Sequence, residues 1–223
     1  MWVRNNLVGD PIMERRIAFL CTLSVCAGSA SADITVFTDR SLWEEAAGGP
    51  VFVEDFNAQT PGIINPGATL DTGLIQIMRD GEPNGSDGLL EIEPGANFGN
   101  LDGTTFLSGE TGAEPHEVVN IMFGGASANA FGADWFSPFS GDGIGLMVDG
   151  ELILLDQIGG FDQGFVGIVS DGPLFSSIQI VGNPAAPTFQ ELWSADNLSF
   201  AVPSPAAASL LSLGALTMVR RKR

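Results

Sequence analysis

Between residues 33 and 201 the chain consists of short apolar runs separated by clusters of Gly, Pro, Asn and Asp, and this pattern constrains the fold more than any other feature. Runs of this length suit β-strands, whereas a helix normally needs about ten or more residues with a period of about 3.6. The intervening clusters supply the residue types that turns require. The segment is therefore predicted to fold as one all-β domain, with a β-sandwich or jelly-roll architecture.

Eleven strands and one helix are predicted within this segment. The strongest local prediction is a hairpin at Asp149-Gly150, because both residues tolerate the positive φ angles of a two-residue turn. The helix is predicted from Ser41 to Ala47, with Ser41 and Glu44 as a capping box and Gly48 closing the end. The predicted strands are Ile34 to Phe37, Val51 to Phe56, Leu74 to Met78, Leu89 to Ile92, Val118 to Phe123, Ala130 to Phe136, Gly145 to Val148, Glu151 to Leu155, Phe165 to Val169, Ser177 to Val181 and Asn197 to Ala201.

The first 32 residues have the pattern of a secretory signal peptide. Two arginines precede an apolar run from Ile17 to Val25, and Ala30 and Ala32 supply small side chains at the spacing that signal peptidase recognises. The run is too short for a bilayer span of about 20 residues. Cleavage before Asp33 is predicted, and Met13, which opens the pattern, is an alternative start of the chain.

The last 22 residues form a three-part tail, in which an extended motif leads into an apolar stretch at 206–219 and a basic cluster follows. Such a cluster stays on the cytoplasmic side of a membrane, which would place residues 33 to 201 outside. The stretch is marginal for a transmembrane helix, since 14 residues reach about 21 Å across a core of about 30 Å, and composition alone leaves a buried helix open. The motif is Val202, Pro203, Ser204 and Pro205, and the basic cluster is Arg220, Arg221, Lys222 and Arg223.

This tail resembles the PEP-CTERM sorting signal, which joins a Val-Pro-Glu-Pro-type motif to a short Leu/Gly/Ala-rich span and an Arg-rich end. Ser204 stands where the family usually has glutamate. The resemblance implies recognition and cleavage by an exosortase, in a Gram-negative-type bacterium that makes extracellular polysaccharide. It also implies an inner-membrane-anchored precursor that is exported to the cell surface or to the extracellular biofilm matrix.

The domain between the two signals is strongly acidic. Residues 33 to 202 contain 25 acidic residues and only two basic ones, Arg40 and Arg79, which gives a formal charge of −23. Such a surface repels nucleic acid and anionic lipid, and it attracts divalent cations or basic partners. Solvation of an exported protein is the simpler interpretation of the acidity. We predict no nucleic-acid partner.

Calcium is the cofactor that this composition favours, because oxygen ligands are abundant and soft ligands are nearly absent. The domain resembles, in architecture, carbohydrate-binding-module-like jelly rolls, in which a structural cation joins the first and last strands. That resemblance implies Glu54 or Asp55 together with Asp196 as ligands, and ordinary strand-end polar residues are an equal alternative. A second acidic segment, from Asp80 to Glu91, approaches calcium-loop spacing and is interpreted as a solvated loop.

Three tryptophans offer rings that can stack on sugars, because an indole face suits the apolar face of a pyranose. They are Trp43, Trp135 and Trp193. Trp135 is interpreted as a core residue because Phe131, Phe136 and Phe139 surround it in the sequence. Trp193 is left open between core and ligand binding, and it is the candidate ligand-binding residue.

Catalytic motifs are scarce in this sequence. His116 is the only histidine, which excludes a multi-histidine zinc site, and no Gly-x-Ser-x-Gly motif accompanies it. No catalytic residue is assigned, and a non-enzymatic protein is predicted. Glycoside hydrolysis by paired carboxylates is a distant alternative, because acids are common enough to supply a suitable pair by chance.

These features predict an exported protein of the cell surface or matrix, with a structural or adhesive role among polysaccharides. The main alternative is a lectin that resembles a carbohydrate-binding module. The predicted partners are signal peptidase, an exosortase-type enzyme and extracellular polysaccharide.

Overall fold

Buried and half-exposed residues alternate along the strands, so each strand turns one face to the interior. In β13 (Ser177–Gly182) and β6 (Leu90–Glu93) every second residue is buried, as a strand with one solvated face requires.

A computed structural model describes residues 33–79, 90–111, 118–136, 144–155, 163–183 and 191–203. In these residues the chain forms two antiparallel sheets and one short helix, which agrees with the predicted all-β class.

The first sheet has eight strands, and the second has six. The other elements are β1 (Ile34–Phe37), α1 (Arg40–Ala47), β2 (Val51–Glu54), β3 (Gly62–Ile63), β4 (Thr69–Asp71), β5 (Gln76–Arg79), β7 (Phe106–Thr111), β8 (Val119–Met122), β9 (Ala130–Phe136), β10 (Ile144–Val148), β11 (Glu151–Leu154), β12 (Gln163–Ser170) and β14 (Glu191–Ala201). The first sheet runs β1-β12-β9-β14-β7-β6-β3, with β2 also paired to β14. The second sheet runs β11-β10-β13-β8-β5-β4.

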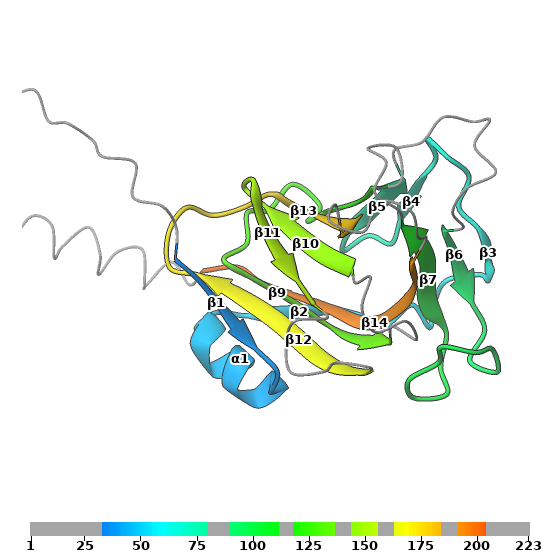
Figure 1. The fold of residues 1–223 in the computed structure, drawn as a ribbon, viewed down its shortest axis with the longest axis horizontal. Helices are drawn as coiled ribbons and strands as arrows, with labels where there is room; N and C mark the ends of the chain where they lie inside the picture. Colours follow the sequence, from blue (N-terminus) through cyan, green and yellow to red (C-terminus); the bar gives the residue numbers. More distant parts are fainter. Residues whose placement is uncertain are drawn as a thin grey trace, which may run out of the picture. The chain divides into compact units, whose positions relative to one another are not determined.

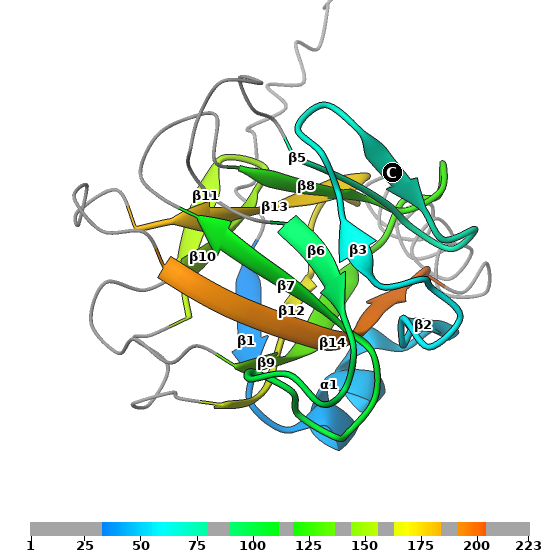
Figure 2. The same ribbon diagram turned by 90° about the vertical axis from the view of Figure 1, so that its right-hand side faces the viewer.

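The two sheets face each other as the layers of a sandwich, seen edge-on in Figure 1. The core between them draws large apolar side chains from both sheets, and burying each one contributes roughly 1.5 to 3 kcal/mol. From the first sheet come Trp135, Val166, Ile168 and Phe200, and from the second come Ile77, Ile121, Leu146 and Ile178. Figure 2 shows β6, β7 and β14 side by side at one end of the first sheet.

The predicted hairpin is present. β10 and β11 pair with Met147 opposite Leu152 and Val148 opposite Glu151. Asp149 and Gly150 connect them with φ angles of 49° and 85°, which is the left-handed geometry of a two-residue turn.

The helix begins one residue earlier than predicted, and its cap is different. Asp39 is the N-cap residue, and its Oδ1 accepts a hydrogen bond from the Leu42 backbone N–H at 3.0 Å. Ser41 therefore lies inside the first turn and does not cap the helix. Asp39 takes this role because its extended backbone directs the carboxylate at the free N–H groups of the first turn. Gly48, with φ of 65°, closes the helix as predicted.

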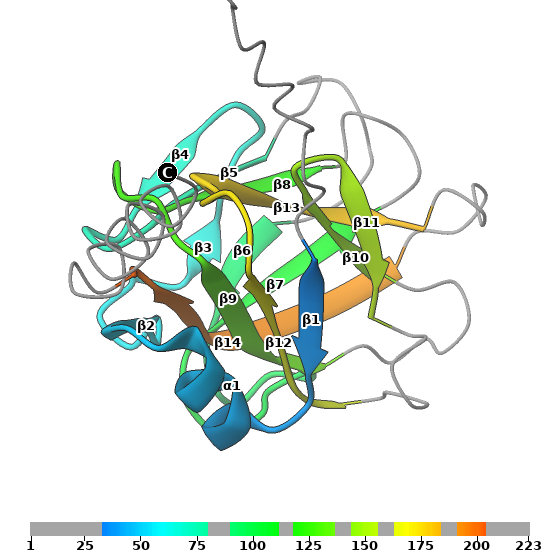
Figure 3. The same cartoon turned by 90° about the vertical axis from the view of Figure 1, so that its left-hand side faces the viewer.

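Helix α1 lies against β12, on the face of the first sheet that points away from the core (Figure 3). Trp43 is fully buried there, and its indole N–H donates to the Ile168 carbonyl at 3.0 Å. A Cβ atom at Gly167 would lie 2.6 Å from the Trp43 ring. Glycine at this position therefore allows the tryptophan to approach the strand closely.

Three strands were not predicted, and β14 is longer than predicted. β3 and β4 are very short, and β7 contains Ser108, Gly109 and Glu110, which have weak strand propensity or carry charge. β14 starts at Glu191, six residues before the predicted strand, and its register to β9 shifts between Asp196 and Ser199. That shift is a β-bulge, and it interrupts the alternation that a sequence pattern relies on.

Candidate functional site

The face of the first sheet that points away from the core, called here the outer face, changes character along its length. β9 illustrates this change, because alternate residues of a strand share a face. Ala130 packs in the small cluster formed with helix α1, Asp134 binds an arginine, and Phe136 lines a groove. The outer face therefore carries an apolar cluster at one end, a polar centre and a groove at the other end.

The polar centre joins helix α1 to the β-bulge of β14. The Arg40 guanidinium donates to Asp134 Oδ2 at 2.9 Å and to Ser199 Oγ at 2.8 Å. Asn197 Nδ2 also donates to Asp134 Oδ2, at 3.0 Å. The guanidinium carbon lies 4.5 Å from the centre of the Phe165 ring, which adds a cation–π contact. This arginine is fully engaged in holding the fold.

Asp196, the next acidic residue along the outer face, is completely buried. Its Oδ1 accepts from the Asn197 backbone N–H at 2.6 Å, and its Oδ2 lies 3.2 Å from Thr104 Oγ1. Burial, together with the nearby charges of Asp102 and Asp134, raises the pKa of Asp196 to about 6, although the hydrogen bond from Asn197 opposes this rise. The polar centre therefore holds Asp102, Asp134 and Asp196 close to one another, and Arg40 is bound to Asp134.

The segment from 94 to 105, which connects β6 to β7 and is called here the 94–105 loop, lies over the outer face. Asn97 Nδ2 donates to Glu93 Oε2 at 2.6 Å, and Asn100 Nδ2 donates to the Thr104 carbonyl at 2.6 Å. Gly99 has a φ of 90° and rests against Ser194, so closely that a Cβ atom there would collide with the serine hydroxyl. These contacts fix the loop against the strands.

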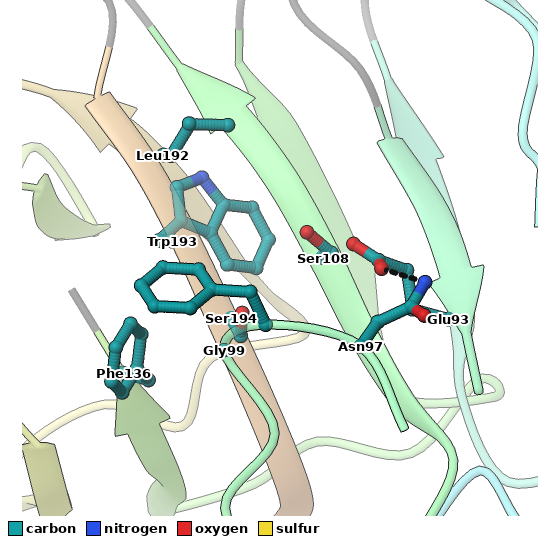
Figure 4. A pocket seen from close by; sticks show the side chains of 9 residues that line it. Glu93, Asn97, Gly99, Ser108, Phe136, Leu192, Trp193 and Ser194 are labelled. Atoms are coloured by element: carbon teal, nitrogen blue, oxygen red, sulfur yellow. Dashed lines mark hydrogen bonds between the residues drawn. The ribbon is translucent and has the colours of Figure 1, made fainter. Parts of the chain in front are cut away.

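A groove of about 260 Å³ lies between this loop and the strands. Figure 4 shows the side chains of Glu93, Asn97, Ser108, Leu192 and Ser194 around it, with the bond between Glu93 and Asn97 dashed. Its lining residues are Glu93, Asn97, Phe98, Gly99, Ser108, Phe136, Leu192, Trp193 and Ser194. It therefore combines aromatic and aliphatic surface with hydroxyl, amide and carboxylate groups, as small-molecule sites generally do.

Phe98 is the most exposed aromatic side chain of the described residues, with 78% of its surface accessible. Its ring stands edge-on to Phe136, with the ring centres 5.2 Å apart and an angle of 89° between the planes. Leu192, on β14, is also 44% exposed. An aromatic side chain left open beside polar groups provides a surface on which a ligand can stack.

The strand register places three lining residues of the groove, Ser108, Ser194 and Phe136, in a row across the sheet with Glu91. Glu91 lies opposite Ser108, Ser108 opposite Ser194, and Ser194 opposite Phe136. Directly paired residues share a face and lie about 5 Å apart. Residues from four strands thus meet along one line, which sequence separation alone conceals.

Sequence reasoning did not select Phe98, Asn97 or Glu93. The sequence signal for Phe98 was an aromatic residue within the turn segment Pro94-Gly-Ala-Asn-Phe-Gly99. Such connections run over the protein surface, so other side chains seldom cover a bulky ring there. Ser108 and Ser194 carried no such signal. Their place in the groove depends on pairing between β7 and β14.

Trp193, the candidate ligand-binding residue, lines the groove, but only 1% of its surface is exposed. Its ring packs over Gly109, where a Cβ atom would collide with it, and lies 6.1 Å from the Trp135 ring. Its indole N–H has no hydrogen-bond acceptor among the described residues. Trp43 and Trp135 are buried as well, so the exposed ring of this site belongs to Phe98.

The predicted calcium ligands have different hydrogen-bond partners, although Glu54 lies opposite Leu198, two residues from Asp196 on β14. Glu54 Oε1 accepts from the Phe56 backbone N–H at 2.9 Å, and Asp55 Oδ1 accepts from that of Asn57 at 3.1 Å. Asp196 is instead close to Asp102 and Asp134. Within the described ranges no group of three or more His, Cys, Asp or Glu side chains is arranged to hold a metal ion. Calcium at Glu54, Asp55 and Asp196 therefore stays a sequence-based expectation.

Several other predicted features lie outside the described residues. These are the signal peptide with Ala30 and Ala32, the Asp80 segment apart from its last residues, His116, and the tail from Ser204 onward, including Pro205 and the basic residues Arg220, Arg221, Lys222 and Arg223. Asp33, Val202 and Pro203 are described, and Val202 donates its backbone N–H to the Pro50 carbonyl at 3.3 Å. In the part of the chain that is described, no helix is long and apolar enough to cross a membrane.

Comparison with known proteins gave structural matches of low similarity. Three solved structures of family 29 carbohydrate-binding modules each align with 65% of this chain. Two are variants used to study ligand recognition, with 16% and 17% identity, TM-scores of 0.33, and coverage of 94% and 87% of the module. The third has 16% identity, a TM-score of 0.32 and coverage of 90%. No family model and no curated protein matches the sequence. TM-scores this low carry no functional argument.

Proposed function

We propose that the β-sandwich binds carbohydrate in the groove under the 94–105 loop. The observation that carries this proposal is the highly exposed Phe98 ring next to the polar side chains of Asn97 and Ser194. A sugar ring has an apolar C–H face and a rim of hydroxyls, so it needs a hydrophobic surface and hydrogen-bonding groups within a short distance. The groove supplies both.

The composition of the groove supports binding rather than catalysis. Glu93 is the only acidic residue among the described residues that line it, and its carboxylate is held by Asn97. Glycoside hydrolysis uses two carboxyl groups on opposite sides of the scissile bond. We therefore propose a non-catalytic carbohydrate-binding protein, with a structural or adhesive role.

The proposed location follows from the two ends of the sequence. Signal peptidase would remove residues 1–32, and an exosortase-type enzyme would process the tail that begins at Val202. A sandwich exported in this way would meet extracellular polysaccharide at the cell surface or in the matrix. Binding in the groove would then attach the protein to that polysaccharide.

Replacing Phe98 with alanine tests the proposal. We expect Phe98→Ala to weaken binding of the full chain to its glycan about tenfold, because stacking of a ring on one aromatic side chain contributes on the order of 1 kcal/mol. The measurement is a glycan array followed by calorimetric titration of the best ligand. Phe52→Ala is the matched control, since Phe52 is a partly exposed phenylalanine on β2, away from the groove lining.

Two results would contradict the proposal. One is the absence of binding to any glycan by the folded wild-type chain. The other is equal loss of affinity in the Phe98 and Phe52 variants, which would point to a general loss of folding. Thermal unfolding of both variants separates that case from a local effect.

A further inference from the structure

The charge of the groove narrows the class of carbohydrate that fits it. Glu93 is its charged lining residue, and two further acids lie on the same outer face, outside the lining. Glu91 is two residues earlier on β6, opposite Ser108, and Glu110 lies opposite Leu192 on β14. Since paired residues and alternate residues share a face, the three carboxylates point to the same side of the sheet.

The domain has no cation available to neutralise these acids. Residues 33 to 202 contain only two basic side chains. Arg40 is bound to Asp134 and Ser199 in the polar centre of the outer face. Arg79 is 5% exposed and lies on β5, in the second sheet. The negative charge at the groove is therefore not balanced from within the domain.

The two acids of β6 also repel each other. Burial and the charge of Glu93 both raise the pKa of Glu91. A cation placed between the strands and the 94–105 loop would remove this repulsion. Glu93 can accept such a group, because a carboxylate has about four lone-pair sites and Asn97 occupies one of them.

We infer that the groove selects glycans that carry free amino groups, with the Glu93 carboxylate binding the sugar ammonium while Phe98 supports the ring. This inference rests on the proposed function and names the ligand class of that same site. Uronic-acid or sulfated glycans would place a second negative charge beside Glu93 and are rejected. Neutral glycans keep the stacking contact and lack the ion pair.

The test compares two oligosaccharides of equal length and linkage, a glucosamine oligomer and its fully N-acetylated counterpart. Calorimetric titration into the full chain at low salt, at a pH where the amines are protonated, should show about fivefold tighter binding of the glucosamine oligomer, the size expected of one partly exposed ion pair. Glu93→Gln should remove this preference. It keeps an oxygen to accept from Asn97, so the loop stays in place.

Glu151→Gln is the matched control, because it removes the same charge from an exposed position on β11 in the second sheet. We expect it to retain the preference. Equal loss in the two variants would show a general attraction to an acidic protein and would overturn the inference. Equal affinity of wild type for both oligomers, with binding still lost in Phe98→Ala, would also overturn it while leaving the proposed function standing. Binding of neither oligomer, nor of any other glycan, would instead overturn the proposed function.

Discussion

Two aspartates on the outer face share one threonine, and their environments move their pKa values in opposite directions. Thr104 Oγ1 lies 2.5 Å from Asp102 Oδ1 and 3.2 Å from Asp196 Oδ2. The hydrogen bond from Thr104 lowers the pKa of Asp102, which is exposed, whereas burial raises the pKa of Asp196 to about 6. A hydroxyl has a single proton, so it cannot donate to both carboxylates at once. Asp196 is therefore the group that takes up a proton in mildly acidic solution.

Asp196 makes the stability of the domain depend on pH. Because its folded pKa of about 6 lies above the ordinary aspartate pKa of 3.8, the folded state binds more protons than the unfolded state between these values. Its contribution is fully present below about pH 4 and is lost as the pH rises through about 6. We expect Asp196→Asn to raise the free energy of unfolding at pH 7.5 by on the order of 1 to 2 kcal/mol and to flatten the profile between pH 4 and 6. Urea unfolding across this range measures both effects.

The comparison for this variant is Glu151→Gln, which removes one negative charge from an exposed strand. It should leave the slope between pH 4 and 6 as in the wild type. An Asp196→Asn protein with an unchanged slope would show that other groups set the pH dependence. A less stable variant at pH 7.5 would show that the carboxylate oxygens are needed for the bonds to Thr104 and Asn197.

At the scale of elements, helix α1 shows how a short helix depends on both its cap and its packing. Eight residues are too few for a stable isolated helix. The Asp39 cap satisfies a free N–H group of the first turn, and Trp43 buries its ring against β12. The helix is thus stabilised at its start and along one face.

Replacing the cap residue tests this account. We expect Asp39→Ala to lower the free energy of unfolding by about 1 kcal/mol, because it removes the acceptor for the Leu42 N–H. Ser41→Ala is the control, since Ser41 is exposed and lies within the helix. Urea unfolding of the two variants should separate them. A larger loss in the serine variant would restore the capping box predicted from the sequence.

At the scale of the whole molecule, the folded domain and the predicted sorting motif overlap. Val202 donates to the Pro50 carbonyl and packs against the core, although it is also the first residue of the motif. A truncation that tests sorting without disturbing the domain must therefore start after Pro203. Removing residues from 202 onward would confuse a folding defect with a sorting defect.

We expect a chain that ends at Pro203 to leave the cell surface and appear in the periplasm or the medium, still folded. The reason is that the apolar stretch at 206–219 and the basic cluster are the only parts of the tail that can hold the precursor at a membrane. Immunoblots of cell fractions measure the location, and circular dichroism of the released protein checks the fold. Surface retention equal to that of the full chain would contradict the tail assignment.

Local chemistry in the sequence determined the β class, the hairpin at Asp149-Gly150 and the helix that ends at Gly48. Each depends on alternation or on a positive φ angle, and both are properties of neighbouring residues. Apart from the start of β14, the ends of the predicted strands differed by a residue or two, because the ends depend on which pairing partner is available. The acidity of the domain was also fixed by the sequence.

Only the tertiary structure decided the site. β7 exists because β14 and β6 pair with it, and this pairing brings Ser108 to Ser194 across 86 positions of sequence. Trp193 is buried because Gly109 on the neighbouring strand leaves room for its ring, whereas Phe98 is exposed because it stands on a loop over the strands. Burial and groove formation follow from contacts between distant segments, and one sequence taken alone does not record which segments meet.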